Sequence, residues 1–181
     1  MKVLILNGSP RDGNTKFAAG TIGESIIENI SGAETEIINV AYKKISACMG
    51  CDVCKQEPKG FCIFDDDMNE INEKVRDADM IVFASPVYWW GISAQLKTVI
   101  DRLYALTGAM DRPGLKIGLF KVGGDDLNSP QYEIISNQFK CICDYLKWDL
   151  VFDKSVSASG REDIKNNEAV VAELKELWKL I

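Results

Sequence analysis

The chain has 181 residues, of which 46% are hydrophobic and 27% are charged, a balance that is ordinary for one globular domain with a sizeable core. Its formal net charge of −6 argues against nucleic acid or an anionic membrane as a partner, and no apolar run is long enough to span a membrane. Histidine is absent, which excludes Ser-His-Asp and Cys-His catalysis and histidine-ligated zinc. A strand begins within two residues of Met1, so we expect no signal peptide and a single domain over residues 1–181.

The first predicted elements are a buried strand at Lys2–Leu6 and a helix from Asn14 to about Ile30, whose apolar residues recur at four-residue steps. The turn between them, Gly8–Thr15, is rich in glycine and small polar residues. Such a turn exposes backbone N–H groups at a helix N-terminus, where the helix dipole also favours an anion. The side chains able to donate to that anion are Ser9, Arg11, Asn14 and Thr15. The alternative interpretation is a plain turn in which Ser9 or Asn14 caps the helix.

Spacing distinguishes this turn from two familiar phosphate loops. The mononucleotide loop requires Gly-x4-Gly-Lys-Ser/Thr, and Gly8 and Gly13 have that separation, but Asn14 takes the place of the lysine. The dinucleotide pattern Gly-x-Gly-x-x-Gly is absent as well. We therefore expect a phosphate site of another type.

The rest of the chain alternates strands and helices. We expect strands at Glu34–Val40, Met80–Ala84, Leu115–Val122 and Leu150–Ser157, helices that begin at Asp67, Ser93 and Pro130, and a last helix with Val170 and Leu174 on its inner face. Asp67 and Glu70 match the capping-box pattern, and Ser93 is a candidate cap for the third helix. This alternation predicts an α/β fold with a five-stranded parallel sheet in the order 2-1-3-4-5 and helices on both faces.

In that strand order the ligand crevice lies at the carboxyl ends of strands 1 and 3. The turn Gly8–Thr15 follows strand 1, and the segment Ser85–Gly91, with three aromatic residues in a row, follows strand 3. A flat aromatic cofactor with a phosphate tail suits this crevice, with the pair Gly123-Gly124 as a third wall or as a plain turn. In the alternative interpretation, Trp89 and Trp90 belong to the core or to a contact between subunits.

Four of the six cysteines lie in a long excursion, Ala41–Ile63, between the second strand and the following helix. Their spacing is Cys48-x2-Cys51-x2-Cys54-x7-Cys62, which begins like the bacterial ferredoxin pattern and predicts a [4Fe–4S] cluster. Two alternatives stay open: a structural zinc site, although zinc favours paired Cys-x2-Cys units, and thiols that hold no metal.

The surroundings of this motif are also informative. Gly50 and Gly60 would let the loop wrap around a cluster. The lysines that flank it could offset the charge of an anionic cluster, dock an acidic electron carrier or simply be solvated; they are Lys43, Lys44, Lys55 and Lys59. Cys141 and Cys143 are two apart on a predicted helix, so their side chains diverge by about 200°. We expect them to be core and boundary residues.

These three motifs together resemble the flavodoxin-like NAD(P)H-dependent FMN reductases and, within them, the iron–sulfur flavoproteins. The resemblance implies a flavodoxin-like fold and a cytoplasmic homodimer or dimer of dimers. It implies that the FMN phosphate is held by Ser9, Arg11, Gly13, Asn14 and Thr15, and that the isoalloxazine and its third wall are bordered by Pro86, Val87, Tyr88, Trp89, Gly91, Gly123 and Gly124. The chain departs from the commoner family pattern at Asp125-Asp126, where small residues are more usual.

The function predicted on these grounds is that of an FMN oxidoreductase in which the flavin N5 carries the chemistry and no side chain acts as catalytic acid or base. Electrons would come from NAD(P)H or, with a cluster, from a ferredoxin-type donor, and pass to a small acceptor such as free flavin or a quinone. One alternative is a flavodoxin-type electron carrier without its own substrate. Another is a non-redox zinc module on a nucleotide-binding domain. We also expect self-association through Trp89, Trp90, Ile92 and Tyr104.

Overall fold

The computed structural model describes residues 1–56, 60–108 and 112–181. The strands are β1 (Lys2–Asn7), β2 (Glu34–Asn39), β3 (Met80–Tyr88), β4 (Gly91–Ile92), β5 (Lys116–Gly123) and β6 (Asp149–Ser157). The α-helices are α1 (Asn14–Asn29), α2 (Met68–Asp77), α3 (Ala94–Arg102), α4 (Pro130–Leu146) and α5 (Glu168–Lys175). Single turns of 3-10 helix are η1 (Val40–Tyr42), η2 (Val53–Lys55), η3 (Leu103–Leu106) and η4 (Leu177–Leu180).

Five strands form a parallel sheet in the order β2-β1-β3-β5-β6, and the short β4 pairs antiparallel with the end of β3. Counted without β4, this is the predicted order 2-1-3-4-5, so the flavodoxin-like α/β fold is confirmed. The strand predicted at Met80–Ala84 is longer than expected and continues to Tyr88. Its extension carries the backbone directly into the β4 hairpin.

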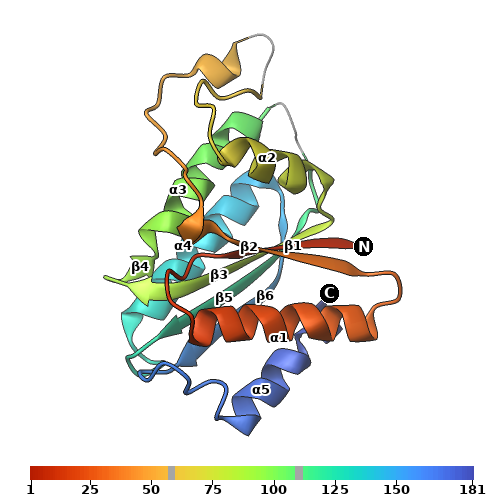
Figure 1. Cartoon of the computed structure of the whole chain (residues 1–181), viewed down its shortest axis with the longest axis vertical. Coiled ribbons are helices and arrows are strands. Elements are labelled where there is room, and N and C mark those ends of the chain that lie inside the picture. Colours follow the sequence, from red (N-terminus) through yellow and green to blue (C-terminus); the bar gives the residue numbers. More distant parts are fainter. Residues whose placement is uncertain (57–59, 109–111) are drawn as a thin grey trace.

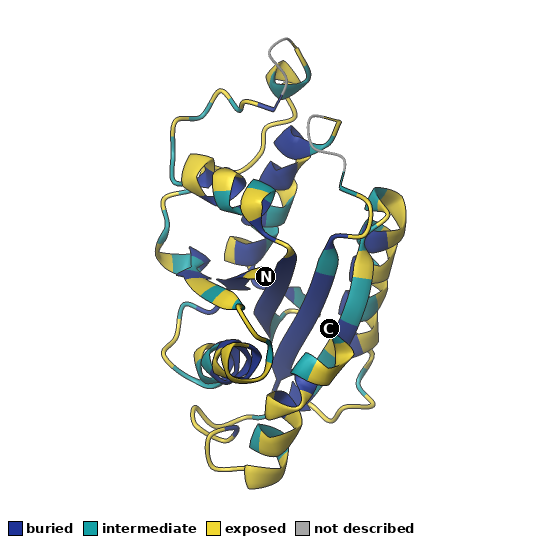
Figure 2. Ribbon diagram, turned by 90° about the vertical axis from the view of Figure 1, so that its right-hand side faces the viewer, coloured by how far each residue is buried: buried dark blue, intermediate teal, exposed yellow. Residues whose placement is uncertain are grey.

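The sheet is buried on both faces because the central strands are apolar at most positions. In β1, Val3 and Ile5 pack on the face covered by α1 and α5, while Leu4 and Leu6 pack on the face covered by α2, α3 and α4. Figure 1 shows these two helical layers, and Figure 2 shows the buried central strands between them. The carboxyl ends of the strands, together with the loops that follow them, are left at one edge of this sandwich.

Two helix starts test the capping predictions. Ser93 caps α3 as expected, since its hydroxyl accepts a hydrogen bond from the Leu96 N–H at 3.3 Å. The capping box at Asp67 is wrong: Asp67 stands at the N-cap of α2 but makes no side-chain cap bond there, and its carboxylate instead accepts from the Lys44 N–H at 2.7 Å. The neighbouring Asp66 provides a bond at the start of the helix instead, because its carboxylate accepts from the Met68 N–H at 3.1 Å.

The described part of the excursion, residues 41–56 and 60–63, leaves the sheet after β2, and its η2 turn lies beyond the ends of α2 and α3 (Figure 1). Among the described residues, no helix is both long and apolar enough to cross a membrane.

Candidate functional site

A cavity of about 200 Å³ lies at the carboxyl ends of β1, β3, β5 and β6. Nine of the twelve residues predicted to bind the cofactor line it: Ser9, Arg11, Gly13, Asn14, Thr15, Pro86, Val87, Gly123 and Gly124. The two loops at the topological switch point therefore meet in one place, together with the glycine pair that follows β5.

The turn after β1 is held in shape by its own polar groups. The Ser9 N–H donates to Asn7 Oδ1 at 3.1 Å, and Ser9 Oγ accepts from the Arg11 N–H at 3.1 Å. Gly8 packs against the start of α3, where an added Cβ would lie 2.6 Å from Ser93 Oγ and 2.7 Å from Leu96 Cβ. A glycine is required here because the turn and α3 approach too closely for any side chain.

Several donors around this turn are left available to a ligand. The N-terminus of α1 has no side-chain cap, and Thr15, although only 2% exposed, makes no side-chain hydrogen bond with the described residues. Arg11 forms no ion pair within the described chain, and its guanidinium lies 5.9 Å from the centroid of the Tyr88 ring. The N-terminus of α1 and the side chains of Arg11 and Thr15 thus supply N–H and O–H donors that remain available at the cavity.

The charge of the cavity is opposite to that of the whole chain. Two arginines, Arg11 and Arg161, line it, and no aspartate or glutamate is found among its described lining residues. In a chain of net charge −6, this concentration of positive charge favours an anion over a cation or a neutral ligand.

The fourth wall of the cavity, residues 158–161, follows β6 and was not among the predicted site residues. The Arg161 Nε–H donates to the Asp12 carbonyl at 2.6 Å, and the Ala158 N–H donates to the Gly123 carbonyl at 2.8 Å. This loop therefore braces both the turn after β1 and the glycine pair after β5. It follows a predicted strand and combines small residues with an arginine, so the rule that ligands bind at carboxyl ends of strands would have found it.

Asn14 has a structural part in addition to the predicted contact with the cofactor. Its Nδ2 donates to the Gly160 carbonyl at 2.7 Å, and its Oδ1 accepts from the Ile164 N–H at 3.1 Å. Much of the side-chain amide is thus used to hold the fourth wall against α1. Asn14 still lines the cavity, as the first residue of the helix.

Tyr88, Trp89 and Gly91, the other three predicted residues, do not line the cavity. They form the hairpin between β3 and β4, next to the cavity residues Pro86 and Val87. Trp89 and Trp90 both have positive φ, 48° and 60°, which is uncommon for bulky residues. Their rings pack edge to face at 5.4 Å, and Trp89 is 91% exposed. The hairpin is therefore a strained turn that carries a large aromatic surface into solvent.

Asp125 and Asp126, at which the chain departs from the commoner pattern, lie just outside the cavity lining. The Asp125 carbonyl accepts from the Tyr132 hydroxyl at 2.9 Å, and the Asp126 carboxylate accepts from the Asn128 N–H at 2.9 Å. Both residues thus shape the turn into α4 rather than adding negative charge to the cavity.

The four clustered cysteines form a second candidate site, because Cys48, Cys51, Cys54 and Cys62 all line one small cavity. Gly50 and Gly60 both have positive φ, 64° and 90°, a backbone conformation that favours glycine at these two positions of the loop. Burial raises the pKa of the Cys54 thiol.

Within the described residues, no three candidate ligands lie close enough to hold one metal ion. A cubane cluster makes a different demand, since it binds each thiolate at a separate iron. The donor set, four thiols that line one cavity, has the number and the chemistry of the ligands that such a cluster requires.

The cysteine segment is fastened to α3 and η3. The buried Arg102, at the end of α3, pairs with Asp66 at 2.8 Å and donates to the Ser46 carbonyl at 2.7 Å. Lys55 Nζ donates to the carbonyls of Tyr104 and Thr107 at 2.6 and 2.7 Å. Lys55 is therefore engaged by the protein itself and not free to dock a carrier.

The other flanking lysines are placed as follows. Lys43 pairs with Glu70 at 2.9 Å, which ties the start of the excursion to α2. The Lys44 backbone N–H is the one held by Asp67. Lys59 lies outside the described residues.

The two candidate sites share no lining residue, and α3 separates them. This helix begins at Ser93, whose N–H donates to Ser85 Oγ at 2.9 Å beside the first cavity, and ends at Arg102 in the second. At 1.5 Å per residue a helix of this length spans roughly 13 Å. The cysteines are therefore about one helix length from the crevice rather than at its rim.

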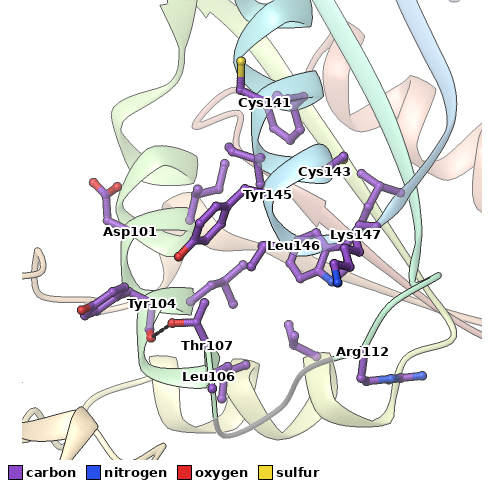
Figure 3. A pocket seen from close by; sticks show the side chains of 18 of the residues that line it. Asp101, Tyr104, Leu106, Thr107, Arg112, Cys141, Cys143, Tyr145, Leu146 and Lys147 are labelled. Atoms are coloured by element: carbon purple, nitrogen blue, oxygen red, sulfur yellow. Dashed lines mark hydrogen bonds between the residues drawn. The ribbon is translucent and has the colours of Figure 1, made fainter.

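A larger cavity, about 1260 Å³, lies between η3 and the C-terminal half of α4 (Figure 3). Cys141 is exposed and Cys143 is buried, as predicted for a boundary and a core residue, and burial raises the pKa of Cys143 to about 11. This cavity shares Cys48, Gly50, Asp101 and Tyr104 with the cysteine site but no residue with the cavity at the strand ends. It is mostly apolar, so we assign the anion site to the smaller, basic cavity.

A flavodoxin-like sheet with a basic cavity at its carboxyl edge defines an α/β protein whose switch point carries a cavity that favours an anion. The chain belongs to the NADPH-dependent FMN reductase family, whose family model matches residues 1–128. The structure is also similar to a solved NAD(P)H:quinone oxidoreductase from Methanothermobacter marburgensis, with a TM-score of 0.73 at 15% identity over 99% of this chain and 96% of that one. That likeness concerns the fold.

Two relatives are similar in sequence to much of the chain. An iron-sulfur flavoprotein of Methanocaldococcus jannaschii is 44% identical over 128 residues, which cover 68% of this chain and 60% of the relative. An iron-sulfur flavoprotein of Methanosarcina thermophila is 35% identical over 138 residues, which cover 76% of this chain and 70% of the relative. The match to the M. jannaschii protein thus spans about three fifths of that protein's length.

Proposed function

We propose that the protein is an FMN-dependent oxidoreductase that takes electrons from NAD(P)H or a ferredoxin-type donor and passes them to a small acceptor such as a flavin or a quinone. The observation that carries this proposal is the convergence of Arg11, Thr15, Gly123 and Arg161 on one basic cavity at the switch point. Membership in the FMN reductase family supports the same choice of cofactor.

Each wall of the cavity has a task in this proposal. The turn Ser9–Thr15 would bind the phosphate through the uncapped N-terminus of α1, the Thr15 hydroxyl and the Arg11 guanidinium. FMN, when bound, supplies the redox chemistry at its isoalloxazine. The cavity measures about 200 Å³, which is smaller than most small-molecule sites, at roughly 300–1,000 Å³. It would therefore hold the phosphate end of FMN and not the whole cofactor. The hairpin residues Tyr88, Trp89 and Gly91 adjoin it and would border the ring.

The four-cysteine cavity supports a further element, a [4Fe–4S] cluster held by Cys48, Cys51, Cys54 and Cys62. Four thiols around one cavity match the ligand number of such a cluster. Relatives named iron-sulfur flavoproteins, at 35% and 44% identity, support the assignment. A cluster would favour a ferredoxin-type donor, whereas a metal-free segment would favour NAD(P)H.

The cellular setting follows from the resemblance alone. We place the protein in the cytoplasm as a homodimer or a dimer of dimers, with the exposed hairpin Trp89-Trp90 as the contact surface. Nucleic acid and membrane are not proposed as partners.

Steady-state kinetics separate the enzyme from the flavodoxin-type carrier. Purified protein loaded with FMN should oxidise NAD(P)H, or a reduced ferredoxin, in the presence of excess quinone or free flavin. A carrier without its own substrate would bind FMN and show almost no turnover with any of these pairs. FMN should also bind more tightly than FAD, because the turn is built for a terminal phosphate.

Absorbance and elemental analysis test the cluster. Anaerobically reconstituted protein should contain about four irons per chain and show broad visible absorbance beneath the flavin bands. Cys51→Ser should remove that absorbance and leave the flavin bands, while Cys141→Ser, at an exposed cysteine outside the four-cysteine cavity, should leave both. One zinc per chain without iron would identify the structural zinc site instead, and four free thiols would leave a plain flavin reductase.

A further inference from the structure

Arg102 ends α3 inside the protein, with a side chain only 1% exposed. A fully buried arginine needs partners, and Asp66 accepts from both of its terminal nitrogens at 2.8 and 3.1 Å. The Ser46 carbonyl accepts from Nη1 at 2.7 Å, and the Phe64 ring centroid lies 5.1 Å from Cζ. Because Ser46 precedes the first clustered cysteine while Phe64 and Asp66 follow the fourth, this one guanidinium joins both ends of the cysteine segment.

One of the three guanidinium nitrogens, Nε, is left without a hydrogen bond within the described chain. Arg102 Nε is buried and has no hydrogen-bond partner among the described residues. The same side chain lines the cavity of the four cysteines. Burial by itself lowers the pKa of Arg102, but hydrogen bonding to Asp66 and the nearby sulfur of Cys62 raise it above its ordinary value. A buried charged N–H without a hydrogen-bond partner destabilises the folded protein, so an acceptor on the cavity side would remove this cost.

We propose that Arg102 is a positioning residue for the iron–sulfur cluster, with its Nε–H as the donor to a sulfur in the four-cysteine cavity and its charge as the local counterion. This inference rests on the cluster proposed above. The reduction potential of such clusters depends on net charge and on hydrogen bonds to the sulfurs. A cation beside the thiolates favours the reduced state, which carries one more negative charge.

The charge arrangement allows a test with opposite signs. Arg102→Gln removes the cation, so the midpoint potential of the cluster in a redox titration should become more negative. Asp66→Asn removes the carboxylate that offsets Arg102, so the potential should become more positive. If Arg102 merely fastened the loop, both variants would loosen it, and the two shifts would have the same sign or be absent.

Two further variants complete the design. Arg102→Lys keeps the charge without the planar donor set. The midpoint potential of its cluster should lie between those of wild type and Arg102→Gln. Arg112→Gln is the matched control, because Arg112 also donates to backbone carbonyls, those of Arg76 and Ala78, but does not line the cysteine cavity. Its potential should equal that of wild type. Iron should be lost to a chelator roughly 10- to 100-fold more readily from Arg102→Gln, as for other residues that support metal ligands.

Arg102→Gln leaves the Asp66 carboxylate without its cation, which lowers the stability of the folded state. The double variant Arg102→Gln/Asp66→Asn removes both charges and is compared with Asp66→Asn, so that Arg102 is tested without an unpaired carboxylate. The double variant should have the more negative potential. Equal potentials in this pair, with about four irons in the wild type, overturn the role of Arg102 alone. A wild-type chain that takes up no iron overturns the cluster and the role of Arg102 with it.

Discussion

Asn14 donates its side-chain amide to the Gly160 carbonyl at 2.7 Å, although 146 positions separate the two residues in the chain. The first and last walls of the cavity are thereby joined by one side chain. Since the same amide accepts from the Ile164 N–H, the loop after β6 has two bonds to the start of α1. The shape of the proposed phosphate site thus depends on a contact between distant parts of the sequence.

Asn14→Ala should loosen this wall and weaken FMN binding by up to roughly tenfold, because it removes hydrogen bonds worth about 0.5–1.5 kcal/mol each. Fluorescence titration of apoprotein with FMN measures the effect. Asn29→Ala is the matched control, since Asn29 lies on the same helix and, among the described residues, its side chain bonds the Ser25 carbonyl alone, at 2.8 Å and away from the cavity. Equal affinities for the two variants would contradict the role given to Asn14.

Arg11→Ala should weaken FMN binding more strongly, by roughly 10- to 150-fold, because a hydrogen bond to a charged group contributes about 1.5–3 kcal/mol. Arg11 has no ion pair among the described residues that would compete with the phosphate. Lys97→Ala removes one positive charge from an exposed helical pair with Asp101 and should leave the affinity unchanged. Unchanged affinity in Arg11→Ala would remove Arg11 from the phosphate site.

Most of the fold was predictable because strand and helix patterns are local. The apolar run at Met80–Ala84 and the cap at Ser93 each identify an element without reference to the rest of the chain. The capping error at Asp67 arises because a longer-range contact replaces the local one. Asp67 has the spacing of a cap, but it bonds the Lys44 N–H instead, because the excursion returns alongside α2.

The candidate site divides in the same way. Residues in motifs, such as Ser9, Thr15 and Gly123, were found because turn chemistry is visible in the sequence. The wall at 158–161 was not found, because its place depends on bonds to Asp12 and Asn14 that tertiary folding creates. Ile92 was expected at an exposed surface but is only 8% exposed, since its pairing with Val87 turns it into the core.

The pH dependence of stability should reveal Asp66. Burial by itself raises the pKa of Asp66, but hydrogen bonds from Arg102 and from the Ser46 and Met68 N–H groups lower it below its ordinary value. A carboxyl whose pKa is lower in the folded state stabilises the protein above its unfolded pKa of about 3.9, and this contribution is lost as the pH falls through the folded value.

Melting temperatures of wild type and Asp66→Asn should therefore differ most near neutral pH and converge below about pH 4. Asp77→Asn, at an exposed carboxylate with a 3.7 Å partner, should follow the wild type at every pH. A constant difference between wild type and Asp66→Asn down to pH 3 would contradict the assignment.

Lys121, on β5, offers a test of a buried charge within the sheet. Its side chain is 1% exposed and pairs with Asp153 on the neighbouring strand β6, which is 21% exposed. Lys121→Met should destabilise the protein by about 3 kcal/mol, because it leaves the carboxylate without its partner. Lys121→Met/Asp153→Leu should recover most of that loss, since well-packed apolar residues can replace a buried pair. Urea unfolding at a fixed FMN concentration measures both, and a double variant no more stable than the single one would contradict the account.

The last prediction concerns self-association through the hairpin. Trp89 is 91% exposed and Trp90 49% exposed, and both adopt a strained backbone conformation that holds the rings outward. Strain and solvent-exposed apolar area are both unfavourable in an isolated chain, so a second copy that covers the rings would offset them.

Trp89→Asn is the sharpest variant, because asparagine tolerates the positive φ of 48° and so removes the ring while keeping the turn. A buried aromatic anchor commonly contributes about 2 kcal/mol or more, so the dimer should dissociate roughly 30-fold more readily. Sedimentation velocity at micromolar concentration with FMN bound makes the comparison. Tyr145→Ser, at an aromatic residue that is 82% exposed on α4, should leave the association unchanged. A wild-type chain that sediments as a monomer under these conditions rules out the hairpin as a subunit contact, and the exposed rings would then be free to border the flavin alone.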